Sequence, residues 1–252
     1  MKLKNSVRWM ATRFRPQAGI CAACGLLSCA VLWATSPPPD AKPASAEETA
    51  AAAAPVEPGA VRCANLIYGD NKTSVCFSSE FLSQIKRDSH VHSNPQLVPV
   101  KMESTEIFQV PFAVMTGEGE FTLTQPQRVN LRNYLSNGGF IVASAGCSSH
   151  PWSSSFRSEI ATIFPELKLS PLDASHPVFH TVYDIDRLDC KKSAGEAHLE
   201  GLEIDGKIVL IFSSDGLNDT SKAGGNCCCC GGNEITNSRQ VNVNLLAYAL
   251  TH

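Results

Sequence analysis

The chain has 252 residues, of which 43% are hydrophobic and 18% charged, and its formal net charge is −3. This is the composition of an ordinary globular protein with one or two domains, and it offers no basic face, so we expect no binding to nucleic acid. The unusual feature is the cysteine content, 11 residues in all.

Residues 1–35 have the pattern of a targeting segment. Basic side chains up to Arg15 precede an uncharged run from Ala18 to Thr35, whose length is at the lower limit for spanning a bilayer. Three interpretations fit this pattern: an uncleaved membrane anchor, a signal peptide cleaved after residues 44–46, and a lipoprotein signal that is cut at Cys29. We favour the anchor, which would tether the chain to the membrane and place the rest of it in the cell envelope, outside the cytoplasm.

The stretch that follows, residues 36–61, is predicted to be a disordered linker. It is rich in proline and alanine and holds almost no large apolar side chain. Such a segment cannot bury enough surface to offset the conformational entropy that ordering would cost. Residues 62–252 therefore form the expected soluble domain.

Predicted strands and helices alternate through residues 62–252. The strands are short apolar runs, and the helices carry one apolar face and begin near capping residues. We expect strands over 64–68, 97–102, 111–115, 140–145 and 207–213, and helices that open at 78–80 and at 124 and span 154–164 and 241–250. This alternation predicts an α/β domain, a three-layer αβα sandwich with a mostly parallel sheet, preceded by an N-terminal hydrophobic helix.

The helix after Thr124 has the clearest boundaries. Thr124 can cap it, and Pro126 stands in the first turn, where a missing N–H costs nothing. The sequence Asn137-Gly138-Gly139 ends it, because glycine accepts the left-handed conformation that closes many helices. By contrast, residues 172–188 show no clear pattern, and we expect them to loop over the sheet edge.

Polar residues follow several of the predicted strands. In open α/β sheets, ligands bind outside the carboxyl ends of the strands. The loops after 111–115, 140–145 and 207–213 supply the candidate ligand-binding residues, which are Glu118, Ser148, Asp215, Asn218 and Asp219. If the sheet is parallel, Glu118, Cys147 and Asp215 lie at the same edge.

Cys147 is the candidate nucleophile. It follows the strand 140–145 directly, at a turn into a helix, and a helix N-terminus favours a thiolate and supplies N–H donors for an anion. This is where a nucleophilic cysteine would be built. The alternative is a small buried packing residue, since no base is identified in the sequence.

Four consecutive cysteines form a candidate metal site. Thiolates bind zinc and other thiophilic metals, and glycines on both sides let the backbone fold around an ion. The usual CxxC spacing is absent, however, and the alternative is disulfide pairing with Cys63, Cys76, Cys147 or Cys190. The candidate ligands are Cys227, Cys228, Cys229 and Cys230.

Several motifs in succession resemble a known family. They are PFAVMTGEGEFTLT, LRNYLSNGGFIVASAGCSS, SFRSEIATIFPE, SHPVFHTVYDI, LEGLEIDGKIVLIFSSDGLND and VNVNLLAYAL. This order is similar to that of an uncharacterised bacterial family, domain of unknown function 4159, over residues 62–252. The resemblance implies a fold like that of the class I glutamine amidotransferases, a flavodoxin-like sandwich, and implies no established activity.

The chain departs from the amidotransferase pattern at the residues that carry that chemistry. The second glycine of the G-x-C-x-G elbow is missing around Cys147, and His176 is not followed by the acid of the H-x-E pair. Related members often have a histidine where this chain has Glu118. Glutamine hydrolysis is therefore not the expected activity.

Three functions remain open from the sequence. The first is a tethered domain outside the membrane, non-catalytic or of unknown activity, that binds a ligand or metal at the strand ends. The second is a cysteine-dependent hydrolase or transferase that uses Cys147. The third is a structural component of an envelope assembly. No protein partner is predicted.

Overall fold

The computed structural model describes residues 58–70, 76–192, 197–222 and 234–252. The predicted anchor, most of the predicted linker and the cysteine quartet lie outside these ranges, so the predictions made for them stay predictions. No helix within the described ranges is long and apolar enough to cross a membrane.

The described elements alternate between strands and helices. The strands are β1 (Cys63–Ile67), β2 (Val98–Lys101), β3 (Phe112–Gly117), β4 (Phe140–Ala145), β5 (Ser170–Pro171), β6 (Glu200–Ile204) and β7 (Lys207–Ser213). The α-helices are α1 (Glu80–Asp88), α2 (Gln125–Ser136), α3 (His150–Ile163) and α4 (Ser238–Thr251). Short 3₁₀ helices are η1 (Thr105–Gln109), η2 (Gly146–Ser148), η3 (Pro177–Phe179) and η4 (Thr220–Lys222).

The strands form one mostly parallel sheet, as predicted. Its order is β2-β1-β3-β4-β7-β6-β5, and β2, β1, β3, β4 and β7 all run parallel to one another. Only β6 reverses direction, so it pairs antiparallel with both β7 and β5. The strands β3 and β4, in which every residue is buried, lie in the interior of the sheet, as expected for strands whose two faces are both covered.

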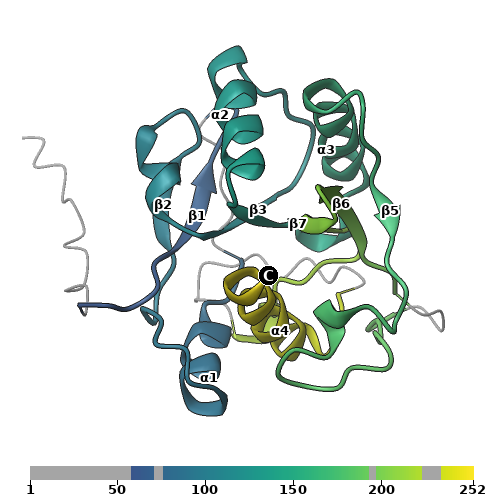
Figure 1. Cartoon of the computed structure of the whole chain (residues 1–252). Helices are drawn as coiled ribbons and strands as arrows, with labels where there is room; N and C mark the ends of the chain where they lie inside the picture. The colour runs from purple at the N-terminus through teal and green to yellow at the C-terminus, as the bar shows by residue number, and fades with distance from the viewer. Residues whose placement is uncertain (1–57, 71–75, 193–196, 223–233) are drawn as a thin grey trace, which may run out of the picture. The chain divides into compact units, whose positions relative to one another are not determined.

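Helices cover both faces of the sheet. Helices α2 and α3 pack on one face and α1 and α4 on the other (Figure 1). The side chains of β3 alternate between the two cores: Ala113 and Met115 face α2 and α3, whereas Phe112 and Val114 face α1 and α4. The predicted three-layer arrangement is therefore confirmed.

Two helix starts illustrate how capping decides a boundary. Thr124 caps α2, as predicted, by accepting a hydrogen bond from Gln127 N, and Gln127 Oε1 accepts from Thr124 N, which completes a capping box. Helix α3 begins at His150, earlier than the predicted 154, because the Ser149 side chain caps it by accepting from Trp152 N. The serine cap was the signal that the apolar pattern did not capture.

Strand β6 was not predicted from the sequence. This strand forms a hairpin with β7 through Asp205 and Gly206, whose φ angles are 49° and 77°. An Asp-Gly pair with two positive φ angles is the preferred tight turn of a hairpin, so the signal was present. The mixed polar sequence of β6 hid it.

Residues 172–188 do not simply loop over the sheet edge. They leave the edge strand β5 and then pack on the face that α1 and α4 cover, where Val178, Phe179, Ile185 and Leu188 are buried in the core. The side chain of His176 caps η3 by accepting from Val178 N. The missing periodicity reflects irregular backbone whose apolar side chains are nonetheless buried.

Two histidines in this segment should give opposite pH dependences of stability. Burial lowers the pKa of His176, so the unfolded chain binds the proton first and stability is lost as pH falls below about 6.5. A hydrogen bond to Ala174 O, with help from Asp184, raises the pKa of His180, so its contribution is present at low pH and lost as pH rises through the folded pKa.

Replacing each histidine with asparagine should change the pH dependence of thermal stability in opposite directions. His176→Asn, which can still cap η3, should reduce the loss of thermal stability between about pH 8 and about pH 5.5, and His180→Asn should increase it. Thermal unfolding at several pH values measures both. Identical pH profiles for the two variants would contradict the assignment.

Candidate functional site

The candidate site lies at the ends of three neighbouring parallel strands. Gly117 of β3 pairs with Ala145 of β4, and Ser144 pairs with Ser213 of β7. The loops that leave these strands therefore start side by side. We call this region the carboxyl edge, defined by the loops 118–120, 146–149 and 214–219. It holds Glu118, Cys147 and Asp215, so their predicted placement is confirmed.

The loop after β4 contacts the loops on both sides of it. Sγ of Cys147 lies 3.2 Å from Oε1 of Glu118. Ser148 Oγ donates to the backbone oxygen of Asp215 at 2.6 Å, and Gly119 N donates to Ser149 Oγ at 3.2 Å. These contacts join the three loops to one another, which limits the freedom of each.

The backbones at the carboxyl edge approach too closely for side chains. A Cβ atom on Gly146 would lie 2.9 Å from Gly117 O, and one on Gly216 would lie 2.9 Å from Ala145 O. Gly216 also has a φ of 113°, which only glycine adopts easily. Glycine at these two positions lets the three loops pack against one another.

Cys147 and Ser148 both have left-handed backbone conformations. Their φ angles are 53° and 54°, in a region that costs of order 1–3 kcal/mol for residues other than glycine. Such strain persists only where the surroundings hold it, and it is concentrated at functional sites. The turn carries Cys147, half-buried, from β4 toward the start of α3.

The oxidation state of Cys147 bears on its predicted role. Both Cys76 and Cys147 are disulfide-bonded, whereas Cys63 is a free, buried cysteine. A disulfide sulfur carries no proton and is not a thiolate, so its approach to Glu118 is a contact and not a thiol hydrogen bond. A nucleophilic role for Cys147 would require reduction and stays a prediction.

A buried polar network attaches the loop after β7 to the ends of β3 and β4. Asn218 is 1% exposed, and its Oδ1 accepts hydrogen bonds from Ser144 Oγ and from Thr116 Oγ1. Ser144 Oγ accepts from Leu217 N, and Ser78 N donates to Asn218 O. Within the described ranges Asn218 Nδ2 has no hydrogen-bond partner. Asn218 thus links β3, β4 and the start of α1.

Asp219 faces α4. Its Oδ2 accepts from Arg239 Nε at 2.8 Å, and the Asp219 side chain is 12% exposed. Nearby, Glu234 accepts from Thr220 N and Thr220 Oγ1 and pairs with Lys191. These bonds fix the chain on either side of residues 223–233, and they give Asp219 a structural partner.

The carboxyl edge is acidic. Its loops, 118–120, 146–149 and 214–219, carry Glu118, Glu120, Asp215 and Asp219 and contain no Lys or Arg. The described part of the chain contains no group of three or more His, Cys, Asp and Glu residues that could hold a metal ion. The predicted zinc or other thiophilic metal at Cys227–Cys230 falls outside that part and stays a prediction.

Some residues of this region were not predicted. Thr116, Ser144 and Ser213 are all fully buried polar residues at the ends of apolar strands. Ser213 Oγ accepts from Gly216 N, which starts the turn after β7. Each of the three hydroxyls stands at the last or second-last position of an otherwise largely apolar strand. That position is a sequence signal by which all three could have been predicted as residues of the site.

Comparison with known proteins identifies a family but no function. No curated protein matches the chain. Residues 62–250 match the family described as a domain of unknown function (DUF4159), which covers almost all of the predicted domain. The resemblance inferred from the motifs is thus confirmed at the level of the family, and the likeness to the amidotransferases is not. The chain belongs to the DUF4159 family.

Proposed function

We propose that the domain is a non-catalytic binding domain outside the cytoplasm, whose ligand binds at the carboxyl edge. The observation that carries this proposal is the joining of three loops, two of them acidic, around a disulfide-bonded Cys147. The loops that meet there come from adjacent strands, which is where α/β sheets bind ligands. Chemistry by a thiolate has no support in this oxidation state.

Two properties of the carboxyl edge support binding. Contacts between the loops and the Asn218 network restrict the loops before any ligand arrives, which lowers the entropic cost of binding. Asp219 is paired with Arg239, and the other carboxylates of the loops, those of Glu118, Glu120 and Asp215, add negative charge that favours a ligand with positive charge. We therefore infer a basic peptide segment or another polycationic molecule as the class of ligand.

The location outside the cytoplasm rests on the N-terminal pattern and on the cysteines. Disulfides persist in oxidising compartments, and both Cys76 and Cys147 are bonded. Cys63 is the first residue of β1, the first strand of the sheet. Because β1 runs parallel to β3, this residue lies at the edge of the sheet opposite the carboxyl edge. A tether that precedes Cys63 would thus join the domain at the edge opposite the ligand.

The second candidate function is a thiol-dependent hydrolase or transferase. The feature that favours it is the position of Cys147 at a strained turn between β4 and α3, which is how a nucleophile is presented in many α/β enzymes. This function requires reduced Cys147. Hydrolysis of a simple thioester by the reduced protein, lost in Cys147→Ser, would replace our proposal with this one.

The binding proposal predicts where a cationic probe binds. At low salt, titration with tetralysine should shift the amide NMR signals of residues 117–120, 146–149 and 213–219, and tetraglutamate should not. Glu118→Gln combined with Asp215→Asn should weaken tetralysine binding roughly fivefold or more, because two surface charges are lost. The control is Glu106→Gln, which removes an exposed charge from η1 and should change binding less than twofold. Saturation at any other surface, or equal effects of the two variants, would contradict the proposal.

A further inference from the structure

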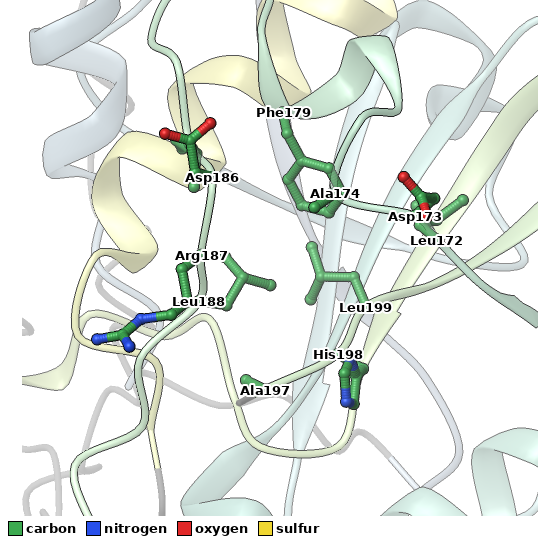
Figure 2. Close-up of a pocket in the computed structure, with 11 residues that line it drawn as sticks. Leu172, Asp173, Ala174, Phe179, Asp186, Arg187, Leu188, Ala197, His198 and Leu199 are labelled. Carbon is green, nitrogen blue, oxygen red and sulfur yellow. The ribbon is translucent and has the colours of Figure 1, made fainter. Parts of the chain in front are cut away.

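A separate pocket lies next to the edge strand β5, on the face of the sheet that α4 covers. Its volume is about 180 Å³, and its walls come from residues 172–174, 185–188 and 197–199 together with Phe179 (Figure 2). None of these residues belongs to the carboxyl edge. The pocket can therefore be considered independently of the proposed function.

The interior of the pocket is apolar and preformed. Phe179, Leu188 and Leu199 point into it, and each is at most 5% exposed (Figure 2). Backbone hydrogen bonds frame it: Leu172 N donates to Leu199 O, Ile185 N to Phe179 O and Ala197 N to Leu188 O. A cavity of about 150 Å³ with comparable walls binds benzene, so one six-membered ring fits.

The rim of the pocket is acidic. Asp173 and Asp186 lie on opposite sides of it (Figure 2). The one arginine in the lining, Arg187, has its guanidinium bound to Asp189 at 2.7 Å. Asp186 also contributes, with Asp184, to raising the pKa of the nearby His180. A cation at the mouth is therefore favoured, and an anion is not.

We propose that this pocket binds a small primary amine with one aromatic ring or a compact aliphatic group. The apolar group enters among Phe179, Leu188 and Leu199, and the ammonium stays at the rim beside Asp173 or Asp186. The volume sets the size of the apolar group, and the carboxylates set the sign of the charge. A few precisely placed polar groups around an apolar cavity are typical of small-molecule sites.

The first test compares three probes of one shape. Benzylamine, benzyl alcohol and benzoate are titrated into the full-length protein, and amide NMR shifts are followed. Benzylamine should bind with a dissociation constant of about 1–10 mM and shift residues 172–174, 185–188 and 197–199. Benzyl alcohol should bind at least roughly threefold more weakly, and benzoate more weakly still. No saturable shift with benzylamine, or equal binding of benzoate, would overturn the proposal.

Variants locate the site. Asp186→Asn keeps the shape of the side chain and should weaken benzylamine binding roughly threefold without changing benzyl alcohol binding. The control is Asp184→Asn, whose side chain is 88% exposed and outside the lining, and it should change benzylamine binding less than twofold. Ala197→Leu should fill the cavity and abolish the binding of both probes. Unchanged binding in Ala197→Leu, with a native unfolding temperature, would also overturn the proposal.

Discussion

Replacing Gly117 with alanine should destabilise the domain by about 3 kcal/mol or more. A Cβ atom at this position would lie 2.4 Å from Tyr68 Oη and 2.9 Å from Trp152 Nε1. Both rings are 1% exposed, and they are joined by a hydrogen bond of 2.6 Å from Trp152 Nε1 to Tyr68 Oη. Tyr68 in turn donates to Thr116 O at 3.0 Å. Neither ring has room to retreat, so the hydrogen bonds or the packing must break.

Gly119, two residues further along the chain, provides the control. Gly119 has a φ of 73°, and a Cβ atom there would have nothing within 4 Å. Gly119→Ala should therefore cost only the backbone strain, about 1 kcal/mol. Chemical denaturation of both variants gives the two free energies of unfolding. Equal losses would show that the contact with Tyr68 and Trp152 does not limit this position.

Replacing Asn218 with alanine should cost about 2–3 kcal/mol of folding free energy. The change leaves the hydroxyls of Ser144 and Thr116 without the Oδ1 atom that accepts from both, in a place where water has no access. A buried donor that loses its acceptor keeps the free-energy cost of its removal from water. The expected loss of stability is therefore larger than the net contribution of one hydrogen bond. The loop after β7 would also lose its side-chain hydrogen bond to β3 and one of its two to Ser144 of β4, the other being that of Leu217 N.

A double-mutant cycle separates this tie from general packing. Ser144→Ala removes one of the two donors, so its cost and that of Asn218→Ala should not add, with a coupling of about 1 kcal/mol. Ser221→Ala, in the same stretch of chain but with an exposed hydrogen bond to Asp219, should cost less than about 0.5 kcal/mol. Additive effects of the Ser144 and Asn218 variants would argue against the network.

The sequence predicted the central strands better than the peripheral ones. The bounds expected for β4 and β7 are those of the structure, because both are continuous apolar runs that glycine or polar residues interrupt at each end. Strand β6, near the sheet edge, has two glutamates and a glycine among its five residues and resembles a loop in sequence. Its existence depends on the pairing with β7, which is a tertiary contact.

The candidate site, too, was predictable only in part from the sequence. The placement of Glu118, Cys147 and Asp215 follows from one rule, that parallel strands end at one edge of the sheet, and needed no side-chain detail. The disulfide at Cys147 and the hydrogen bonds of Asn218 depend on which side chains meet in space. Sequence order carries no information on cysteine pairing, so both pairing and reactivity stayed open until the fold was known.

The thiol state of Cys147 tests the account most directly, because a binding domain and a thiol enzyme require opposite states. The protein, exported and purified without reductant, is alkylated before and after reduction under denaturing conditions, and each cysteine is quantified by mass spectrometry. We expect Cys76 and Cys147 to be modified only after reduction, whereas Cys63, a free cysteine, is modified in both samples. Modification of Cys147 in the unreduced sample would contradict the account and favour the thiol enzyme.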